Sequence, residues 1–467
     1  MKTLKNSRRN FLKKTAVAAS AITIVPRHVL GGRGFIAPSD KVNVALVGAG
    51  GRGNNNLKEL FKLDDVQVTA MADPAEYWDL ANFYYSTTAG RGPVKKRIED
   101  HYQGRSANFK VAEYLDFREM LEKEPSLDAV LCATPDHTHA YICLQSFSAG
   151  KHVYCEKPLT HNIWEAREVK KVASESGLAT QMGNQQHSSV GIRQTVEYLR
   201  AGVLGNITEA HAWVTATRWI PGLKGVPEGT TPLPHGLDWD LWLGPRTKRD
   251  FHEAYVPVTW RDFWDFGCGA MGDFGCHDLD AAVWGLELPL PETVEMFPAG
   301  FSNEHITPYG EIGYYHFPAT DRNDPLKLTW YSGGLRPPRP ELLPDNKDLS
   351  SRGALYVGEK GIMVYEGRGQ APKLYPERLE ATVKELKPTL PPTNGHHRDW
   401  IDAIKDGPKA SSHFKYGAHL TEITLLGVLS LRLGGQKIYW DAENMKAVGI
   451  PKADKYIQEK VRGGWKM

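Results

Sequence analysis

The feature that most constrains this chain is a glycine-rich turn between a short apolar run and a segment of helical periodicity. Residues 42–47, Val-Asn-Val-Ala-Leu-Val, are typical of a buried strand. Gly48-x-Gly50-x-x-Gly53 follows at once, and apolar residues then recur at helical spacing over residues 57–61. In such a unit the first glycine permits a tight turn, the second lets the backbone approach a pyrophosphate, and the third lets the helix pack closely on the strand. The sequence therefore predicts a dinucleotide-binding unit.

The end of the next predicted strand indicates which dinucleotide is bound. This strand ends at Asp73, twenty residues after Gly53. A carboxylate at this point accepts hydrogen bonds from ribose hydroxyls and repels a 2′-phosphate, so NAD is favoured over NADP. Arg52, within the turn, is a candidate phosphate contact that keeps NADP as the less favoured alternative. A second interpretation, in which Asp73 and Pro74 only cap a helix that follows, stays open.

Strand and helix patterns alternate further along the chain. Residues 129–133 and 152–155 are short apolar runs, and residues 140–149 between them have helical character. Such alternation predicts a parallel, doubly wound sheet. A length of 467 residues predicts more than one domain, and a formal net charge of +2 gives no field that would favour nucleic acid.

Two further motifs follow the glycine turn: Ala-Thr-Pro-Asp-His-Thr-His-Ala at 133–140 and Glu-Lys-Pro-Leu at 156–159. With them the chain resembles the glucose–fructose oxidoreductase/inositol dehydrogenase (Gfo/Idh/MocA) family. The resemblance implies an α/β fold, with an N-terminal Rossmann doubly wound parallel sheet and a C-terminal α/β domain on a large, mostly antiparallel open sheet. The open face of that sheet implies a homo-oligomer, either a dimer or a tetramer. We expect a signal with its linker, a Rossmann domain, a substrate and oligomerisation domain, and C-terminal helices that return to the Rossmann domain with a tail, at 1–38, 39–185, 186–395 and 396–467.

The resemblance also implies which side chains contact the cofactor. They lie in the two motifs and at the next predicted strand end: Thr134, Pro135, His139, Glu156 and Asn184. Lys157, beside Glu156, is implied to point at the substrate oxygen next to the nicotinamide. A lysine at the end of a buried strand is costly unless it is paired or has a role, because desolvation penalises its charge. Such a lysine can polarise an alcohol or a carbonyl and relay its proton.

The other half of the site is predicted within Gly-Ala-Met-Gly-Asp-Phe-Gly-Cys-His-Asp at 269–278. The family carries an Asp-x-x-x-His pair on the helix that faces the nicotinamide, and Asp273 and His277 match it. At helical spacing Asp280 continues the same face, and a polar stripe of this kind fits a cleft better than a core. We predict His277 as the general base, Asp273 as a ligand of a neighbouring hydroxyl, and Lys157 as the third member of the proton relay.

A metal site is the alternative for the same stretch, because Cys268 and Cys276 lie close to these residues in sequence. Cys276, however, is about 100° around the helix from His277, so the potential ligands do not converge on one face. We therefore predict no metal.

A loop rich in proline, glycine and tryptophan, residues 217–245, precedes this helix. Loops of such length in compact domains are usually functional. Its aromatic side chains and those that follow it are candidates for a saccharide-binding wall, with core packing as the alternative. The candidate substrate contacts are His187, Trp219, Trp260, Arg261 and Trp264.

The first residues resemble an export signal. Residues 7–13, Ser-Arg-Arg-Asn-Phe-Leu-Lys, match the twin-arginine pattern at every position, and the apolar run at 16–25 is too short to span a membrane. The five cysteines include no Cys-x-x-Cys and do not resemble a disulfide framework. Because the twin-arginine route exports folded proteins, we expect a periplasmic protein without a membrane span that carries a tightly held cofactor.

These features predict an NAD-dependent oxidoreductase that acts on a secondary hydroxyl or ketone of a sugar, glycoside or cyclitol, with hydride transfer to or from the nicotinamide. A redox-neutral NAD-dependent glycosidase, which acts through transient oxidation at C3 and elimination, is the first alternative. A non-catalytic protein that binds NAD or sugar is the second.

Overall fold

The computed structural model describes residues 36–104, 108–367 and 369–467. The chain divides into two compact units, residues 1–41 and 42–467. In the first unit the described residues include a short 3-10 helix, Pro38–Asp40. The predicted twin-arginine signal lies outside the described residues. No helix in the described part of the chain combines the length and the apolarity needed to cross a membrane.

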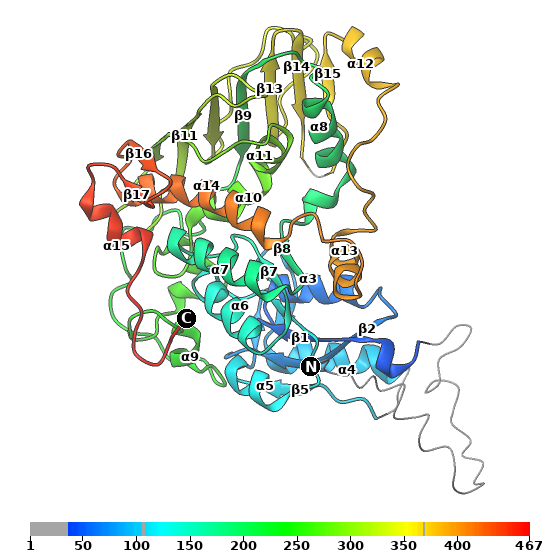
Figure 1. Ribbon diagram of the computed structural model, residues 1–467. Coiled ribbons are helices and arrows are strands. Elements are labelled where there is room, and N and C mark those ends of the chain that lie inside the picture. The colour runs from blue at the N-terminus through cyan, green and yellow to red at the C-terminus, as the bar shows by residue number, and fades with distance from the viewer. Residues whose placement is uncertain (1–35, 105–107, 368) are drawn as a thin grey trace, which may run out of the picture. The chain divides into compact units, whose positions relative to one another are not determined.

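A six-stranded parallel sheet forms the N-terminal part of the second unit (Figure 1). Its strands stand in the order β5 (Ala112–Tyr114), β2 (Val66–Ala72), β1 (Val42–Val47), β6 (Ala129–Cys132), β7 (His152–Glu156) and β8 (Thr180–Gly183). The order reverses at β1, which confirms the predicted doubly wound sheet. A crevice beyond the carboxyl ends of the strands at such a reversal is the usual ligand position.

The strands of this sheet are buried on both faces, which explains their continuous apolar runs. Val44 and Leu46 of β1 pack on one face with side chains of three helices, α3 (Gly51–Leu60), α4 (Arg91–Gln103) and α13 (His396–Ile404). Ala45 and Val47 pack on the other face with α5 (Phe117–Lys123), α6 (His139–Ser148) and α7 (Ile163–Ser176). Trp400 of α13 is fully buried against the sheet.

A nine-stranded sheet forms the second layer of structure. Its order is β15 (Lys373–Tyr375), β14 (Gly361–Tyr365), β13 (Arg352–Gly358), β9 (Ile207–Val214), β12 (Leu326–Tyr331), β11 (Gly310–Phe317), β10 (Thr293–Ala299), β16 (Ile438–Asp441) and β17 (Lys446–Ala447). Only β9 and β12 pair in parallel, so the sheet is mostly antiparallel, as predicted. Its helices are α8 (Val190–Arg200), α10 (Gly269–Asp278), α11 (Asp280–Gly285) and α14 (Phe414–Arg432), of which α14 packs on both α7 and α10.

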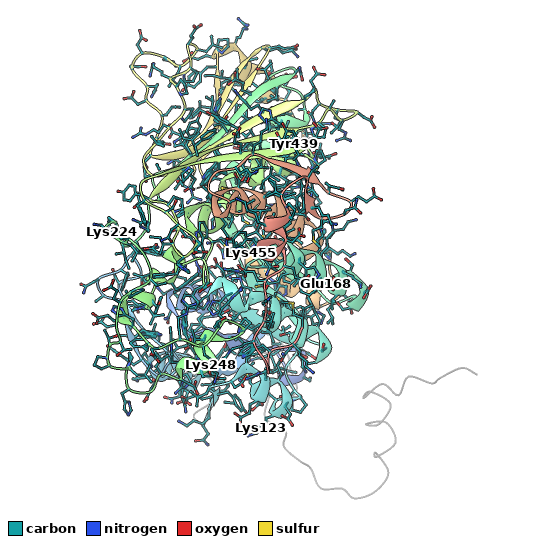
Figure 2. All side chains as sticks on the ribbon, turned by 90° about the vertical axis from the view of Figure 1, so that its left-hand side faces the viewer. Lys123, Glu168, Lys224, Lys248, Tyr439 and Lys455 are labelled. Atoms are coloured by element: carbon teal, nitrogen blue, oxygen red, sulfur yellow. The ribbon has the colours of Figure 1, made fainter. Side chains whose placement is uncertain are left out.

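The C-terminal region contributes more than the predicted helices and tail. β16 adds to the large sheet by pairing with β10, where Ile438 is fully buried opposite Val294. Figure 2 shows Tyr439 of β16 and Lys455 on the outside of this region. Shorter elements complete the described fold: β3 (Trp78–Asp79), β4 (Thr88–Ala89), α9 (Trp239–Leu243), α12 (Arg378–Val383) and α15 (Asp454–Ile457).

Candidate active site

A cavity of about 1070 Å³ opens at the carboxyl ends of β1, β2, β6 and β7 and extends to α10 and the loop before it. Small-molecule pockets commonly enclose about 300–1000 Å³, so this cavity has room for a dinucleotide together with a small substrate. Thirteen of the sequence-predicted residues line it: Gly48, Gly50, Arg52, Asp73, Thr134, Pro135, Glu156, Lys157, Trp219, Trp260, Arg261, Asp273 and His277.

The glycine turn fits the close approach of a pyrophosphate. Gly48 has a φ of +94°, and a Cβ there would lie 2.6 Å from the carbonyl carbon of Ala133. A Cβ on Gly50 would meet no atom within 4 Å, so at this residue the backbone is open to a ligand. Gly53 does not line the cavity, and a Cβ there would lie 2.2 Å from the carbonyl oxygen of Gly48. Gly53 therefore permits close packing of α3, whose N-terminus favours anions.

Asp73 lines the cavity with both carboxylate oxygens already hydrogen-bonded. Oδ2 accepts from the backbone N–H of Ala49 at 2.6 Å, and Oδ1 accepts from that of Ala75 at 2.8 Å. The second contact closes a turn at Pro74 and caps no helix, because the next element along the chain is β3. A carboxylate has about four acceptor sites, so both oxygens keep capacity for ribose hydroxyls. Arg52 lines the cavity and makes no hydrogen bond with another described residue, so its N–H groups are available to a phosphate, although its charge also interacts with that of Glu156.

Glu156 has one satisfied and one unsatisfied carboxylate oxygen. Oε1 accepts from Nδ2 of Asn56 at 2.9 Å and from Nε2 of Gln185 at 2.7 Å. Oε2 is buried and has no partner in the described part of the chain. An unsatisfied buried acceptor is costly, typically by about 1–3 kcal/mol. Oε2 lies against Gly183, where an added Cβ would be 2.6 Å from it, so Glu156 lines the cavity but does not offer this oxygen to a ligand.

Lys157 and Asp273 join the two halves of the site. Nζ of Lys157 donates to Oδ1 of Asp273 at 2.5 Å and to its carbonyl oxygen at 2.7 Å. Lys157 follows β7, and its bond to Pro158 is cis. An ammonium has three N–H donors, so one remains for an acceptor in the cavity.

His277 lies one helical turn after Asp273 and also lines the cavity. Its Nδ1 has no hydrogen-bond partner among the described atoms. Burial lowers the pKa of His277 well below its ordinary value, and the positive charges of Lys157 and Arg352 lower it further. The imidazole is therefore neutral near pH 7 and able to accept a proton.

Small residues fix the position of α10 against α14. A Cβ on Gly275 would lie 2.7 Å from Cγ2 of Thr424. Sγ of Cys276 lies 3.6 Å from Oγ1 of Thr424, so this cysteine faces α14 and does not line the cavity. Asp273 and His277 lie on the other side of the helix. The helical geometry that separates Cys276 from His277 is thus seen in the structure.

The loop before α10 forms one wall of the cavity. The guanidinium of Arg261 lies 4.1 Å from the ring centroid of Trp260, and its Nε lies 3.3 Å from Oδ1 of Asp273. Trp219 lines the same wall. Trp264, predicted as a substrate contact, is instead 1% exposed and packs in the core, where its Nε1 donates to the carbonyl oxygen of Asn303 at 3.1 Å.

His139 was predicted to contact the cofactor, but it does not line the cavity. It is 1% exposed. Its Nδ1 lies 2.8 Å from the carbonyl oxygen of Pro158, and its Nε2 lies 2.9 Å from that of Thr134. His139 therefore links two loops that border the cavity, and its contribution is to position them.

Asn184 and His187 were also predicted to line the site, and the structure buries both completely. Asn184 donates to Oδ2 of Asp280 at 3.1 Å, and Nδ1 of His187 lies 2.9 Å from the same oxygen. Tyr416 of α14 donates to Oδ1 of Asp280 at 2.5 Å. The polar face of α10 thus continues into α11 but is covered there by the 3-10 turn Gln185–Ser188 and by α14. The predicted stripe reaches the cavity only at Asp273 and His277.

Several residues that line the cavity had not been predicted. The ring of Tyr85, on the β3–β4 hairpin, packs so closely on Gly51 that a Cβ there would lie 2.3 Å from it. The pair of adjacent tyrosines, Tyr84 and Tyr85, was the only feature of the sequence that could have indicated this contact. Burial raises the pKa of Asp136 to about 6, and this residue stands inside the 133–140 motif. The sequence around Arg352 of β13 does not predict that this residue belongs to the site, because only the folded sheet brings it near His277.

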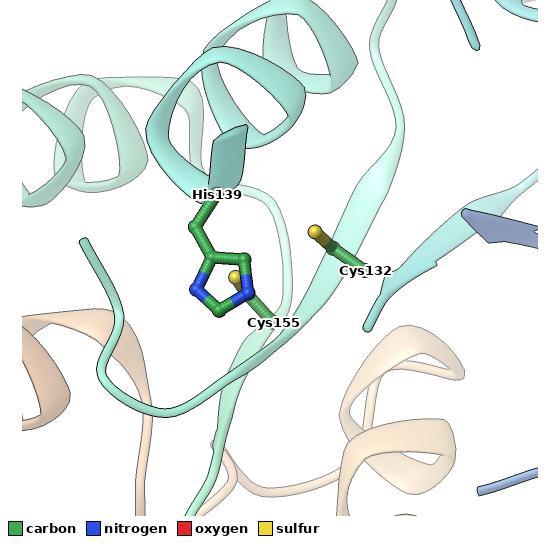
Figure 3. Close-up of side chains that lie close together, drawn as sticks. All are labelled: Cys132, His139 and Cys155. Carbon is green, nitrogen blue, oxygen red and sulfur yellow. The ribbon is translucent and has the colours of Figure 1, made fainter. Parts of the chain in front are cut away.

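Cys132, His139 and Cys155 form a buried group (Figure 3). Their potential ligand atoms lie within 4.8 Å of one another, and the two cysteines are direct partners on β6 and β7. Both ring nitrogens of His139 already face carbonyl oxygens, so a metal would have to break one of those contacts. A structural zinc site also needs four ligands. We interpret this group as part of the packed core.

Two family models match the chain. The Gfo/Idh/MocA model described as an oxidoreductase family, NAD-binding Rossmann fold, matches residues 42–184. The model of the family's C-terminal alpha/beta domain matches residues 197–300. Together the two matches cover more than half of the chain.

The curated relatives share only about a quarter of their aligned residues with this chain. The chain is 24% identical over 231 residues to a Glycosyl hydrolase family 109 protein from Shewanella pealeana. The aligned region covers 46% of this chain and 48% of that protein. It is 27% identical over 168 residues to the levoglucosan dehydrogenase of Pseudarthrobacter phenanthrenivorans. The aligned region covers 36% of this chain and 35% of that enzyme. The match thus spans about half of these relatives, or less.

A solved structure shows the same fold. The WlbA dehydrogenase from Bordetella pertussis, in complex with NADH and UDP-GlcNAcA, superposes with a TM-score of 0.56 and 16% identity. The similarity covers 85% of this chain and 98% of that one. The two family matches also begin at the first strand of the parallel sheet and reach into the large sheet, in the order that the structure shows. The chain therefore belongs to the Gfo/Idh/MocA oxidoreductase family, whose N-terminal part is an NAD-binding Rossmann fold.

Proposed function

We propose that this protein is an NAD-dependent oxidoreductase that acts on a secondary hydroxyl or ketone of a sugar, glycoside or cyclitol. One observation carries the proposal. Lys157 is hydrogen-bonded to Asp273 one helical turn from His277, and all three line the cavity that the glycine turn opens. The arginine and tryptophan wall of the cavity and the similarity to a levoglucosan dehydrogenase support a sugar-like substrate.

The cofactor would be held by Gly50, Arg52 and Asp73, which offer the open backbone, a positive charge and the acceptors described above, with Glu156 in the lining of the same cavity. When bound, NAD supplies the hydride acceptor or donor at its nicotinamide ring.

The protein's own residues would move the proton. Neutral His277 accepts the proton of the substrate hydroxyl, as a base needs to be unprotonated to do so. The remaining N–H of Lys157 donates to the same substrate oxygen and stabilises the negative charge that develops on it. The carboxylate of Asp273 fixes Lys157 and balances the positive charge of the protonated histidine. In the reducing direction His277 returns its proton to the oxygen.

The direct test has two steps. The purified protein is denatured and any released nucleotide is identified by mass spectrometry. The native protein is then screened with sugars, glycosides and cyclitols for a change in absorbance at the reduced-nicotinamide band. Bound NAD and reduction of it by a polyol are expected, and a protein that binds no nicotinamide nucleotide would overturn the proposal.

A redox-neutral glycosidase is the second candidate. The relatives named Glycosyl hydrolase family 109 proteins and the Tyr85 hairpin that covers Gly51 support it, because a covered cofactor suits a reaction that regenerates NAD in place. Release of free sugar from an aryl glycoside without net NADH would favour this candidate. Accumulation of a keto-sugar would favour the oxidoreductase, and NAD binding without turnover on either panel would indicate a non-catalytic binding protein.

Export by the twin-arginine route and assembly into a homo-oligomer are part of the proposal. Residues 7–13 support export, and the family resemblance supports assembly. Cell fractionation of the full chain and of a variant with both Arg8 and Arg9 replaced by lysine tests the first point. Light scattering coupled to size-exclusion chromatography tests the second, with a monomer as the contrary result.

A further inference from the structure

The last ten residues, 458–467, form a tail that runs from α15 towards α9 (Figure 1). Its first anchor is Glu459, whose buried carboxylate forms ion pairs with Arg246 and Arg432. Nδ1 of His161 lies 2.9 Å from the same carboxylate. Although burial acts to raise it, the two arginines hold the pKa of Glu459 well below its ordinary value, so the anchor is charged.

A second anchor holds the middle of the tail against α9. The side chain of Arg462 donates to the carbonyl oxygen of Gly244, to Oδ1 of Asp240 at 2.7 Å and to its carbonyl oxygen at 2.6 Å. The backbone N–H of Arg462 donates to the carbonyl oxygen of Pro245 at 3.1 Å. The course of the tail is therefore fixed at residues 459 and 462, before it reaches Trp465.

These anchors place Trp465 in the wall of the dinucleotide cavity. Trp465 is 8% exposed and lines the cavity. Its ring centroid lies 6.2 Å from that of Phe117 and 6.0 Å from that of Tyr141. The guanidinium of Arg118 lies 4.4 Å over the ring and donates to the carbonyl oxygen of Gly464 at 3.2 Å.

The sheet order shows which end of the cavity this is. The lining residues near Trp465 include Leu115 and Phe117, which follow β5, whereas Lys157 follows β7. With β2, β1 and β6 standing between them and neighbouring strands about 4.8 Å apart, the carboxyl ends of β5 and β7 are separated by about 19 Å. Trp465 packs between Phe117 of α5 and Tyr141 of α6, and so lies on the side of the cavity towards β5 and away from β7.

Aromatic and aliphatic side chains dominate this end of the cavity. Trp465, one face of which is covered by Arg118, and Phe117 line it with aromatic groups, and Leu115 and Ile142 line it with aliphatic groups. A flat heterocycle without charge gains from burial against such surfaces and from stacking on a ring, by about 1–3 kcal/mol per base. Of the parts of NAD, the adenine base has this chemistry, and the carboxylate of Asp73 beside it suits the adjoining ribose.

We propose that the tail forms one wall of an adenine subsite, with Trp465 as the side chain on which the base packs. The proposal rests on the proposed function, because it requires NAD in the cavity. It assigns to residues 458–467 a role in binding NAD to the Rossmann part of the chain.

The test compares NAD with nicotinamide mononucleotide, which lacks the adenosine half. Dissociation constants are measured by calorimetry on protein freed of co-purified nucleotide, for the wild type, Trp465→Ala and Trp440→Ala. Trp440 is the matched control, because it is 7% exposed, belongs to the same C-terminal region and does not line the cavity. We expect Trp465→Ala to raise the Kd for NAD at least tenfold and to leave that for nicotinamide mononucleotide unchanged. Trp440→Ala should change neither.

Each outcome separates this inference from the proposed function. An NAD affinity within twofold of wild type in folded Trp465→Ala overturns the adenine subsite and leaves the proposed function standing. An equal loss for both nucleotides overturns it as well, since the effect would not be specific to adenine. A wild-type protein that binds no NAD overturns both.

Hydrogen exchange on the wild type covers the case in which Trp465→Ala fails to fold. NAD is expected to protect the amides of residues 462–467, and nicotinamide mononucleotide is expected to leave them as they are. Absence of protection by NAD contradicts the inference.

Discussion

Nζ of Lys157 lies 2.5 Å from Oδ1 of Asp273, although the two residues stand 116 positions apart in the chain. The lysine follows a strand of the parallel sheet, and the aspartate belongs to a helix that packs on α14. Although burial acts to raise it, the charges of Lys157 and Arg261 hold the pKa of Asp273 well below its ordinary value. The contact is thus an ion pair at physiological pH, and it joins the two parts of the candidate site.

Lys157→Met should lower kcat by about 10²–10⁴-fold, because the variant loses the N–H that stabilises charge on the substrate oxygen. The Kd for NAD should stay within a few-fold of wild type. Steady-state kinetics and calorimetry measure the two effects, on protein shown to be folded by circular dichroism. Lys62→Met, at an exposed lysine, is the control. Wild-type turnover in Lys157→Met would remove this lysine from the mechanism.

Arg352→Gln should move the acid limb of the pH profile of kcat/KM to higher pH. Burial lowers the pKa of His277, and Lys157 and Arg352 act in the same direction. The base works only when neutral, so activity falls as the pH drops through this pKa. Removal of one positive charge raises the pKa and therefore the pH at which activity falls. Arg352→Lys keeps the charge and should keep the profile, and an unshifted limb in Arg352→Gln would argue against His277 as the base.

Two glycine substitutions should separate cofactor binding from folding. Gly50→Ala meets no atom within 4 Å, so its melting temperature should match wild type while its Kd for NAD rises at least tenfold. Gly53→Ala places a Cβ 2.2 Å from the carbonyl oxygen of Gly48 and should lower the melting temperature. Thermal melts with and without NAD measure both effects. Equal NAD affinity in Gly50→Ala and wild type would mean that the pyrophosphate does not approach this turn.

Asp73→Ser should change both nucleotide preference and stability. The ratio of kcat/KM for NADP to that for NAD should rise at least tenfold, because the carboxylate no longer repels a 2′-phosphate. The free energy of unfolding should fall by about 1–3 kcal/mol, since the single, shorter serine hydroxyl cannot serve the N–H groups of Ala49 and Ala75 together. Asp73→Asn removes the charge but keeps one acceptor oxygen, so its loss of stability should be smaller. An unchanged nucleotide ratio in both variants would exclude contact with the ribose.

Glu459→Gln should lower the free energy of unfolding by about 3–5 kcal/mol near pH 7, because Arg246 and Arg432 lose a buried counter-charge. The folded-state pKa of Glu459 lies well below its ordinary value of 4.5. Its carboxylate therefore stabilises the fold above the unfolded pKa, and this stabilisation is lost as the pH falls through the folded one. Urea denaturation from pH 7 to pH 3 should show the gap between wild type and variant narrowing with acid. The control Glu443→Gln, at an exposed glutamate, should have the same free energy of unfolding as the wild type at each pH.

Much of the fold and part of the site could be predicted from local pattern. Gly48 and Gly50 stand in a strand–turn–helix unit whose conformation their lack of a side chain permits, and both line the cavity. Lys157 follows a buried strand, so its position at the carboxyl edge of a parallel sheet followed from that strand alone. His139 and Trp264 lie in equally suggestive contexts, yet both are buried. Their burial depends on loops and strands far away in the chain.

The sequence by itself determined the periodicity of the elements, the glycine turn and the spacing that places Asp273 and His277 on one helical face. Only the tertiary structure decided where that face meets open space and where it is covered, as at Asp280, and which distant side chains, such as Arg352 and Trp465, complete the cavity. The physical reason is that backbone preference and side-chain periodicity act over a few residues. Burial and electrostatic environment are set instead by whichever segments pack together in space.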